Sequence, residues 1–388
     1  SCVIFLLVRF SVDPVLALLG DLVAIDSVNP SLVPGGAGEG AIGDRVAIAL
    51  RSAGLDVEVT EVAPGRRNVV GVLQARRPGR SLMLCGHLDT VGVEGMNEPF
   101  NPILRNGRLY GRGAQDMKSG VAAMIDAASR LAGRGGLGSG KLVVAAVVDE
   151  EHASLGADSL VQQYGADAAV VTEPTDLAIA TCHQGFEWIE VETRGRAAHG
   201  SRPADGRDAI LLMGRVLNRL WGLRNALTEG SKHSLLGAAS LHASTISGGR
   251  EFSVYPDECR LTIERRTLTG ETPDVGLNEV RSILDELGLE DARFEASARQ
   301  LFNRPPHEIE TDHLIYQTLV GVLHRMGLNG KPVGMSFWTD AAILTRAGTP
   351  ALLFGPRGAG LHSREEYVET ESVCVCRDVL VELAQNFC

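Results

Sequence analysis

Hydrophobic and polar residues repeat along this chain with two distinct periods, one helical and one extended. Apolar residues at helical spacing follow Asp13-Pro14, which predicts an amphipathic first helix capped by the aspartate. Several near-continuous apolar runs are instead typical of parallel strands that are buried on both faces. These runs cover residues 81–85, 141–148 and 168–171. We therefore predict an α/β fold, in which a mostly parallel sheet is covered by helices.

From Phe186 onward the pattern changes, because the strands alternate between apolar and polar residues as in a half-exposed sheet. The predicted elements are strand 188–193, helix 210–221, strands 239–247 and 260–265, helix 272–287 and strand 292–296. This β-α-β-β-α-β order is that of the ferredoxin-like split arrangement. We expect a second domain at residues 185–298, inserted between the two parts of the first domain, 1–184 and 299–388.

Polar and mostly acidic residues follow the buried strands of the first domain. The strand ends carry His87 and Asp89, then Glu150 and Glu151, then Glu173, while Asp116 opens a helical segment and His362 follows a glycine-rich loop. Ligands of open α/β sheets bind beyond the carboxyl ends of the strands, so these side chains are expected to meet. Taken alone, His87-x-Asp89 or Asp116 would fit a solvated turn with helix caps equally well.

Taken together, two imidazoles and three carboxylates are the ligands that a pair of zinc ions needs if one carboxylate bridges them. The candidate ligands are His87, Asp116, Glu151, Glu173 and His362. Two metal ions that share a hydroxide can polarise a carbonyl group. Glu150 would then be the general base that takes the proton of this water and passes it to a leaving nitrogen. The carboxylate of Asp89 would fix the ring of His87.

Composition excludes several other classes of function. The net charge is −11 without a basic block, which argues against nucleic acid or an anionic membrane as a partner. Seven scattered cysteines without CxxC spacing argue against a disulfide framework and favour cytosolic thiols. The apolar run 3–8 is too short to span a bilayer and lacks the features of a signal peptide. We expect a cytoplasmic protein that acts on small molecules.

Six short motifs, in this order, carry a resemblance to a known family. They are Gly86-His-Leu-Asp-Thr-Val91, Gly111-Arg-Gly with Asp116-Met-Lys, Asp149-Glu-Glu151, Thr172-Glu-Pro174, Ala198-His-Gly-Ser201 and Gly360-Leu-His-Ser363. Each motif is weak alone, but all six together resemble the M20 metallopeptidases from Asp13 onward. This family includes acetylornithine deacetylase, succinyl-diaminopimelate desuccinylase, aminoacylase and carboxypeptidase G-type enzymes.

The resemblance implies two zinc ions per subunit, with cobalt or manganese as possible substitutes. It implies that Asp116 bridges both ions, that His87 and Glu173 complete one site, and that Glu151 and His362 complete the other. Glu150 matches the catalytic base of the family, and Asp89 matches its histidine-orienting carboxylate. The inserted domain matches a lid that is usually also the dimerisation domain, so a homodimer is expected.

The resemblance also assigns residues to the substrate side of the site. His199 matches a histidine that reaches a neighbouring active site and stabilises the oxyanion, although a surface histidine is the plain alternative. Arg266 matches an arginine for the substrate carboxylate, and strand alternation lets only one of Arg265 and Arg266 face the site. Thr339 and Asp340 resemble a pocket segment of the family. Ser253 stands where many relatives have asparagine.

These residues predict hydrolysis of the amide bond of an N-acyl amino acid or a small peptide-like substrate. Phe337 and Trp338 stand where several relatives have small residues, so we expect an apolar or aromatic substrate portion instead of ornithine or diaminopimelate. An exopeptidase that acts on dipeptides or on a C-terminal glutamate is the alternative within the family. A non-catalytic binding module is the alternative outside it, but such a module has no need of all five ligands and Glu150.

Overall fold

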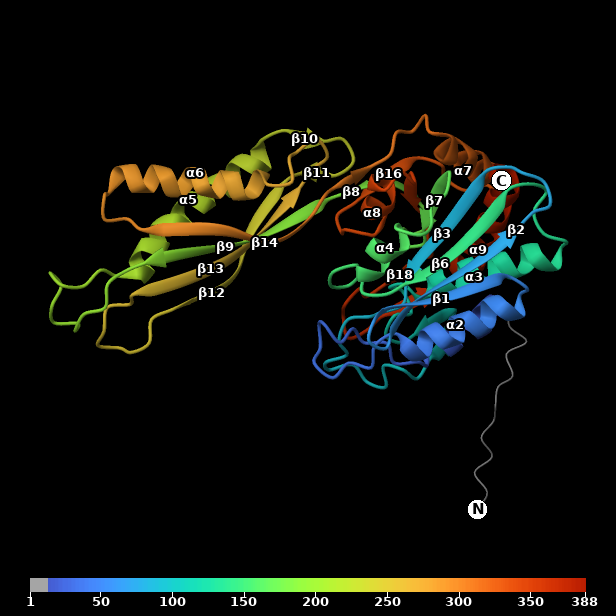
Figure 1. Cartoon of the computed structure of the whole chain (residues 1–388), viewed down its shortest axis with the longest axis horizontal. Helices are drawn as coiled ribbons and strands as arrows, with labels where there is room; N and C mark the ends of the chain where they lie inside the picture. Colours follow the sequence, from blue (N-terminus) through green and yellow to red (C-terminus); the bar gives the residue numbers. More distant parts are fainter. Residues whose placement is uncertain (1–12) are drawn as a thin grey trace, which may run out of the picture. The chain divides into compact units, whose positions relative to one another are not determined.

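Nine strands form a mixed sheet in the computed structural model, which describes residues 13–388 (Figure 1). The strands are β1 (Asp56–Ala63), β2 (Arg66–Gln74), β3 (Ser81–His87), β6 (Lys141–Val147), β7 (Ala168–Val171), β8 (Ile179–His183), β15 (His307–Glu308), β16 (Pro332–Met335) and β17 (Ala351–Leu353). Their order is β1-β2-β6-β3-β7-β17-β8-β15, with β16 beside β8. The neighbours β6, β3, β7 and β17 run parallel, whereas β1, β2, β8 and β15 pair antiparallel.

Helices cover both faces of this sheet, which confirms the predicted fold class. They are α1 (Pro14–Val23), α2 (Gly40–Ser52), α3 (Lys118–Gly133), α4 (Leu155–Leu160), α7 (Leu314–Arg325), α8 (Ala341–Arg346) and α9 (Thr370–Phe387). Helices α1, α2, α3, α7 and α9 pack together over one face and share a single apolar core with it, while α4 and α8 lie against the other face. The carboxylate of Asp13 caps α1 by accepting the N–H of Val15, as the sequence predicts. A small separate sheet has the order β18-β19-β5-β4 and consists of β4 (Ile103–Arg105), β5 (Arg108–Tyr110), β18 (Gly358–Ala359) and β19 (Tyr367–Glu369).

The second compact unit comprises Cys182–Glu308 and Gly334–Trp338, and the rest of the described chain forms the first unit. Its elements are β9 (Gly185–Arg194), α5 (Ala209–Glu229), β10 (Lys232–His233), β11 (Gly237–Ala238), β12 (Ser240–Gly248), β13 (Glu258–Thr267), α6 (Val275–Glu290) and β14 (Ala296–Arg304). The main sheet has the order β12-β13-β9-β14, and α5 and α6 cover one of its faces (Figure 1). Alternation along β9 explains this arrangement, because Ile189 and Val191 pack under the helices while Trp188 points to the opposite face.

The last strand of this unit begins later than its sequence suggests. We expect a strand at 292–296, but the structure has a turn there and β14 at Ala296–Arg304. Phe294 supplies the apolar signal from within the turn, where it packs against the core of the unit. The alternation that defines the strand instead runs on through Phe302, so the expected domain boundary at residue 298 falls inside β14.

Two further observations bear on the environment of the protein. Among the described helices, none combines the length and the apolar character that crossing a bilayer requires. No disulfide bond joins the cysteines of residues 13–388, and Cys85 is fully buried in β3 as its apolar surroundings predict. The apolar run 3–8 lies outside the described residues.

Candidate metal centre

The five predicted ligands come from five separate segments of the first unit, since His87 ends β3 and the other four lie in separate loops. Because β3 and β6 are parallel and His87 pairs with Val147, the segment that follows β6 lies beside His87. This segment carries Glu150 and Glu151, and Glu173 follows β7 on the other side of β3. Asp116 lies just before α3, and His362 lies in the turn between β18 and β19. All five belong to the first unit.

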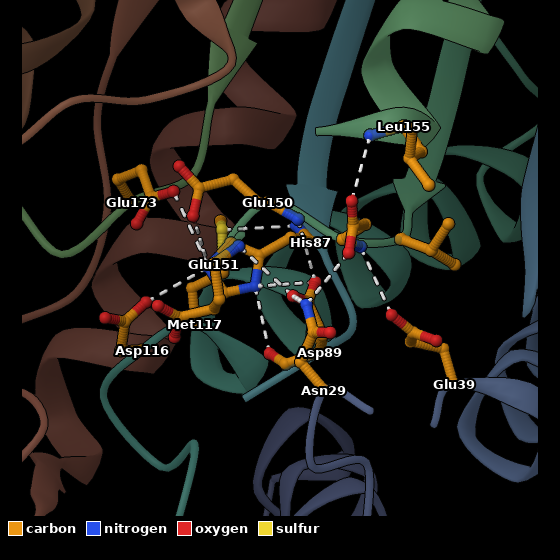
Figure 2. A network of polar contacts seen from close by, with 12 residues as sticks. Asn29, Glu39, His87, Asp89, Asp116, Met117, Glu150, Glu151, Leu155 and Glu173 are labelled. Carbon is orange, nitrogen blue, oxygen red and sulfur yellow. Dashed lines mark hydrogen bonds and ion pairs between the residues drawn. The ribbon is translucent and has the colours of Figure 1, made fainter. Parts of the chain in front are cut away.

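Asp116 contacts two different histidines with its two carboxylate oxygens. Its Oδ1 lies 3.1 Å from Nε2 of His87, and its Oδ2 lies 3.3 Å from Nε2 of His362. Each imidazole has a second acidic neighbour, because Glu173 Oε1 lies 3.7 Å from His87 Nε2 and Glu151 Oε2 lies 3.1 Å from His362 Nε2. Figure 2 shows the carboxylates of Asp116 and Glu173 directed at the ring of His87. The residues thus form two groups that share Asp116.

Burial makes the charged forms of the carboxylates in this cluster unfavourable unless positive charge lies nearby. Burial raises the pKa of Glu150 and of Glu173 well above the usual range for a carboxyl group, and raises the pKa of Glu151 to about 7. Hydrogen bonds with Asp116 and Glu151 raise the pKa of His362 to about 10. The Oε1 atom of Glu151 is buried without a hydrogen-bond partner among the described residues. Buried carboxylates and imidazoles with such an unmatched oxygen fit a pair of divalent cations.

Glu150 lies beside these two groups. Its Oε2 is 3.9 Å from His87 Nε2, and ligand-type atoms of Glu150, His87 and Glu173 lie within 4.8 Å of one another. Asp340, which directly precedes α8, is buried and contributes negative charge near Glu150. Thr339 is also buried, and its hydroxyl accepts the N–H of Ala341 at the start of this helix.

Asp89 holds the backbone of the acidic segment after β6. Its Oδ1 accepts the N–H of Glu150, and its Oδ2 accepts the N–H of Glu151, each at 3.1 Å. The carboxylate is 3.6 Å from His87 Nδ1, whereas the backbone carbonyl oxygen of Asp89 is only 3.0 Å from this nitrogen. The ring of His87 therefore hydrogen-bonds the carbonyl group of Asp89, and the carboxylate serves mainly the neighbouring loop.

A buried network behind Asp89 adds three residues from outside the six sequence motifs, which are Asn29, Glu39 and Arg66 (Figure 2). The Nδ2 atom of Asn29 donates to Asp89 at 2.7 Å and to Asp149 at 3.1 Å. Arg66 bridges Asp149 and Glu39, with distances of 2.8 Å from Nη1 to Asp149 Oδ1 and from Nε to Glu39 Oε2. Glu39 lies at the end of the glycine-rich loop 34–40, and Arg66 lies on β2, which is distant in the sequence from the motifs. The sequence offers only one indication of the roles of Glu39 and Arg66, which is that each is a charged residue next to a segment that becomes buried.

Three residues that the resemblance assigns to the substrate side of the site lie in the second unit. They are His199, Ser253 and Arg266. The loops that carry His199 and Ser253 are neighbours, since the N–H of Gly200 donates to the carbonyl oxygen of Ser253 at 2.7 Å. His199 is exposed, and its Nδ1 lies 2.8 Å from the hydroxyl of Ser201.

The adjacent arginines of β13 have different environments. Arg265 is completely buried and forms ion pairs with Glu271 at 2.8 Å and Glu279 at 3.0 Å. Arg266 points to the other face of the sheet, where it contacts Glu264 at 2.7 Å and its guanidinium carbon lies 5.4 Å from the ring centroid of Phe186. Arg265 is therefore used in buried ion pairs, whereas Arg266 lies on the outer face of the sheet.

An α/β sheet whose edge gathers histidines and carboxylates in this way defines a metal-dependent hydrolase. The sequence profile of peptidase family M20/M25/M40 matches residues 83–386, and the chain belongs to this family. The resemblance predicted from the six motifs is thus confirmed, and with it the assignment to the hydrolases of a metallopeptidase family.

Relatives and solved structures cover nearly the whole chain. The acetylornithine deacetylase of Myxococcus xanthus is 30% identical over an alignment of 388 positions, which includes 96% of this chain and 97% of that protein. A tripeptidase of Staphylococcus aureus has a similar structure, with a TM-score of 0.81, 21% identity and coverage of 96% and 97%. A dinuclear metal-binding peptidase of Bacillus subtilis has a TM-score of 0.73, 16% identity and 96% coverage of both chains. The two structures show the shared fold.

Proposed function

We propose that this protein hydrolyses the amide bond of N-acyl amino acids at a centre of two zinc ions, for which cobalt or manganese can substitute. The contact of Asp116 with both His87 and His362 carries the proposal, because a carboxylate with an imidazole at each oxygen suits a bridge between two ions. His87 and Glu173 would complete one site, and Glu151 and His362 the other. When bound, the ions would supply an activated water and polarise the carbonyl group of the substrate.

Glu150 is the proposed general base. It is not needed as a ligand, and its carboxylate lies at the border of the ligand cluster, within 3.9 Å of His87 Nε2. From this position it would take a proton from the attacking water and hand it to the leaving nitrogen. Asp89 would position Glu150 by holding its backbone N–H. Thr339 and Asp340 are proposed to line the substrate pocket of the first unit.

The second unit is proposed to act as lid and dimerisation domain of a homodimer. Its edge strand β12 carries the exposed Ile246, and the neighbouring helix α5 exposes Leu211 and Trp221 by 71% and 61%. An edge strand next to exposed apolar side chains is suited to pairing with a second copy. His199 of such a copy would stabilise the oxyanion of the reaction.

We further propose that Arg266 binds the carboxylate of the substrate and that an apolar or aromatic group lies next to it. Phe186, Trp188 and Phe302 form an aromatic cluster on the face of Arg266, with ring centroids 5.3 to 6.0 Å apart. Ser253, in place of the asparagine of many relatives, would line the same substrate region. The lack of disulfide bonds in residues 13–388 supports a cytoplasmic location.

Two observations favour deacylation over the alternatives. The Myxococcus relative, which is similar over its full length, is named a deacetylase, whereas the likeness to the tripeptidase rests on fold. A binding module without catalysis would not need Glu150 next to a complete set of ligands. An exopeptidase remains the second candidate, because the same cluster would cleave a peptide bond.

A substrate panel combined with metal analysis tests the proposal. The purified protein is stripped with a chelator, reloaded with zinc and assayed on N-acetyl-phenylalanine, N-acetyl-methionine, N-acetylornithine and dipeptides. We expect two zinc ions per chain, activity that returns with zinc, and a preference for the N-acetylated apolar amino acids. A large preference for N-acetylornithine would contradict the apolar pocket, and turnover of dipeptides alone would establish the exopeptidase.

A further inference from the structure

The loop that carries Asp116 is held by a carboxylate from the loop that carries His362. Glu366 is only 1% exposed and lies just beyond the turn of His362. Its Oε1 accepts hydrogen bonds from the backbone N–H groups of Gln115, at 2.8 Å, and Asp116, at 3.0 Å. A backbone atom of the bridging residue is thus fixed directly by Glu366.

The other oxygen of Glu366 is used in the same loop. Its Oε2 accepts the N–H of Gly113 at 3.0 Å and a hydrogen bond from Nη1 of Arg112 at 2.6 Å. Arg112 also returns to the histidine loop, where its Nη2 donates to the carbonyl oxygen of Ser363 at 3.0 Å. Two ionic side chains therefore link the loops in both directions.

Such contacts are stronger than neutral hydrogen bonds, because each involves the charged side chain of Glu366 or Arg112, and both of these side chains are buried. Buried backbone N–H groups need acceptors, and Glu366 supplies them for most of the segment 113–116. The backbone of this segment cannot shift without losing several of these bonds together. The 3.3 Å contact between Asp116 Oδ2 and His362 Nε2 depends on the relative position of the same two loops.

We propose that Glu366 is a positioning residue of the metal centre, which sets the distance between Asp116 and His362 through the loops that carry them. The inference rests on the proposed function, since it takes these two residues to bind the same ion. Glu366 contacts the backbone of Asp116 and, through Arg112, the loop of His362, so its effect is expected on metal affinity before any effect on the chemical step.

The test is zinc affinity of the full chain with Glu366→Gln. The amide group places a donor against backbone N–H groups that need an acceptor, so the loop of Asp116 must shift. Metal-free protein is titrated with zinc in competition with a chromophoric chelator, and cobalt absorption spectra report the ligand geometry. We expect the apparent Kd of the more weakly held ion to rise about 10- to 100-fold, as is usual for residues that orient metal ligands, with an altered cobalt spectrum.

Glu187→Gln is the matched control. Glu187 is also 1% exposed and accepts the backbone N–H groups of Gly276 and Leu277, at 2.7 and 3.3 Å, but these belong to the second unit. We expect parental zinc affinity in this variant. An equal loss of affinity in both glutamine variants would overturn the proposal, because it would show general destabilisation.

Glu366→Asp keeps both acceptor oxygens on a shorter side chain and is expected to lose less affinity than Glu366→Gln. If Glu366→Gln does not fold, the zinc affinity of Glu366→Asp is used to test the proposal. Parental zinc affinity and an unchanged cobalt spectrum in Glu366→Asp would then overturn it. Failure of the proposed function has a different signature, since the parental protein itself would then bind no zinc. Two tightly bound ions in the parental protein and in both Glu366 variants would contradict the positioning role alone.

Discussion

The carboxylate of Asp89 accepts the backbone N–H of Glu150 at 3.1 Å, although the two residues follow different strands of the sheet. This hydrogen bond, together with the bond to the N–H of Glu151, fixes the start of the acidic segment after β6. The orientation of the proposed base therefore depends on a residue that is not itself a proposed metal ligand. Asp89 thus has two separate roles. Its carboxylate holds the backbone of Glu150 and Glu151, whereas its carbonyl oxygen contacts the ring of His87.

Asp89→Asn tests this separation of roles. The amide nitrogen would face a backbone N–H, so the segment of Glu150 should shift, while the carbonyl contact to His87 stays. We expect kcat to fall about 10- to 100-fold, as for other supporting residues of metal sites, with zinc content near the parental value. A parallel loss of zinc would instead indicate that the carboxylate mainly orients His87.

Glu150→Gln should remove the proton transfer and keep the metal centre. Glutamine has nearly the same shape but cannot accept the proton of the attacking water. We expect two bound zinc ions and a kcat lower by about 10²- to 10⁴-fold, the usual contribution of a general base. Steady-state kinetics with metal analysis of the same preparation measure both quantities, and near-parental turnover would refute the assignment.

Single amide variants of the proposed acidic ligands should show which residues hold which metal ion. Glu173→Gln removes a neighbour of His87, and Glu151→Gln removes a neighbour of His362, so each should weaken one ion. Asp116→Asn should weaken both, because Asp116 contacts both imidazoles. Zinc content after dialysis is expected near one ion per chain for the glutamate variants and near zero for Asp116→Asn. One ion in all three variants would contradict the bridge.

The neighbouring arginines of β13 offer a matched pair. Arg266→Gln should raise KM with little change in stability, and a lost charged hydrogen bond reduces kcat/KM by about 10- to 100-fold. Arg265→Gln should instead lower the free energy of unfolding by about 3 kcal/mol, because Glu271 and Glu279 lose their buried partner. Kinetics and urea denaturation of both variants separate the two roles. If only Arg266→Gln lost stability, the structural role would belong to Arg266 and not to Arg265.

Acid should weaken the anchor of the first helix. Burial alone would raise the pKa of Asp13, but hydrogen bonds with Arg377 and Val15 hold it below its ordinary value of 3.8. A carboxylate with a lowered pKa stabilises the fold above its unfolded pKa and loses this effect as the pH falls through its folded pKa. Asp13→Asn should therefore be less stable than the parental protein at pH 6, and the difference should shrink below about pH 4. Denaturant unfolding of the metal-free proteins measures this, and a constant difference would contradict it.

The ligand cluster could be predicted from the sequence because its signals are local. Four of the five proposed ligands follow an apolar strand or precede a helix, and parallel strands bring their ends to one edge of the sheet. His87 and Glu173 are examples, since each follows a strand that the apolar pattern predicts. His362 instead follows a glycine-rich loop. The alternation along β13 likewise shows that only one of Arg265 and Arg266 faces outward, although not which.

The supporting residues could not be predicted because their roles depend on distant partners. Asn29, Arg66 and Glu366 are ordinary polar residues in the sequence, and only the fold places them against Asp89, Asp149 and the loop of Asp116. The antiparallel direction of β1, β2, β8 and β15, and the start of β14, cannot be predicted from the sequence for a related reason. Apolar periodicity reports burial, whereas strand direction and turns depend on tertiary packing.

The place of β17 in the sheet has a consequence for the order of events during synthesis. This strand lies between β7 and β8, but it follows the whole second unit in the chain. A ribosome releases β7 and β8 long before residues 351–353, and His362 emerges later still. The nascent chain therefore carries an incomplete sheet and an incomplete set of proposed ligands until the second unit and the segment with β17 and His362 have both emerged.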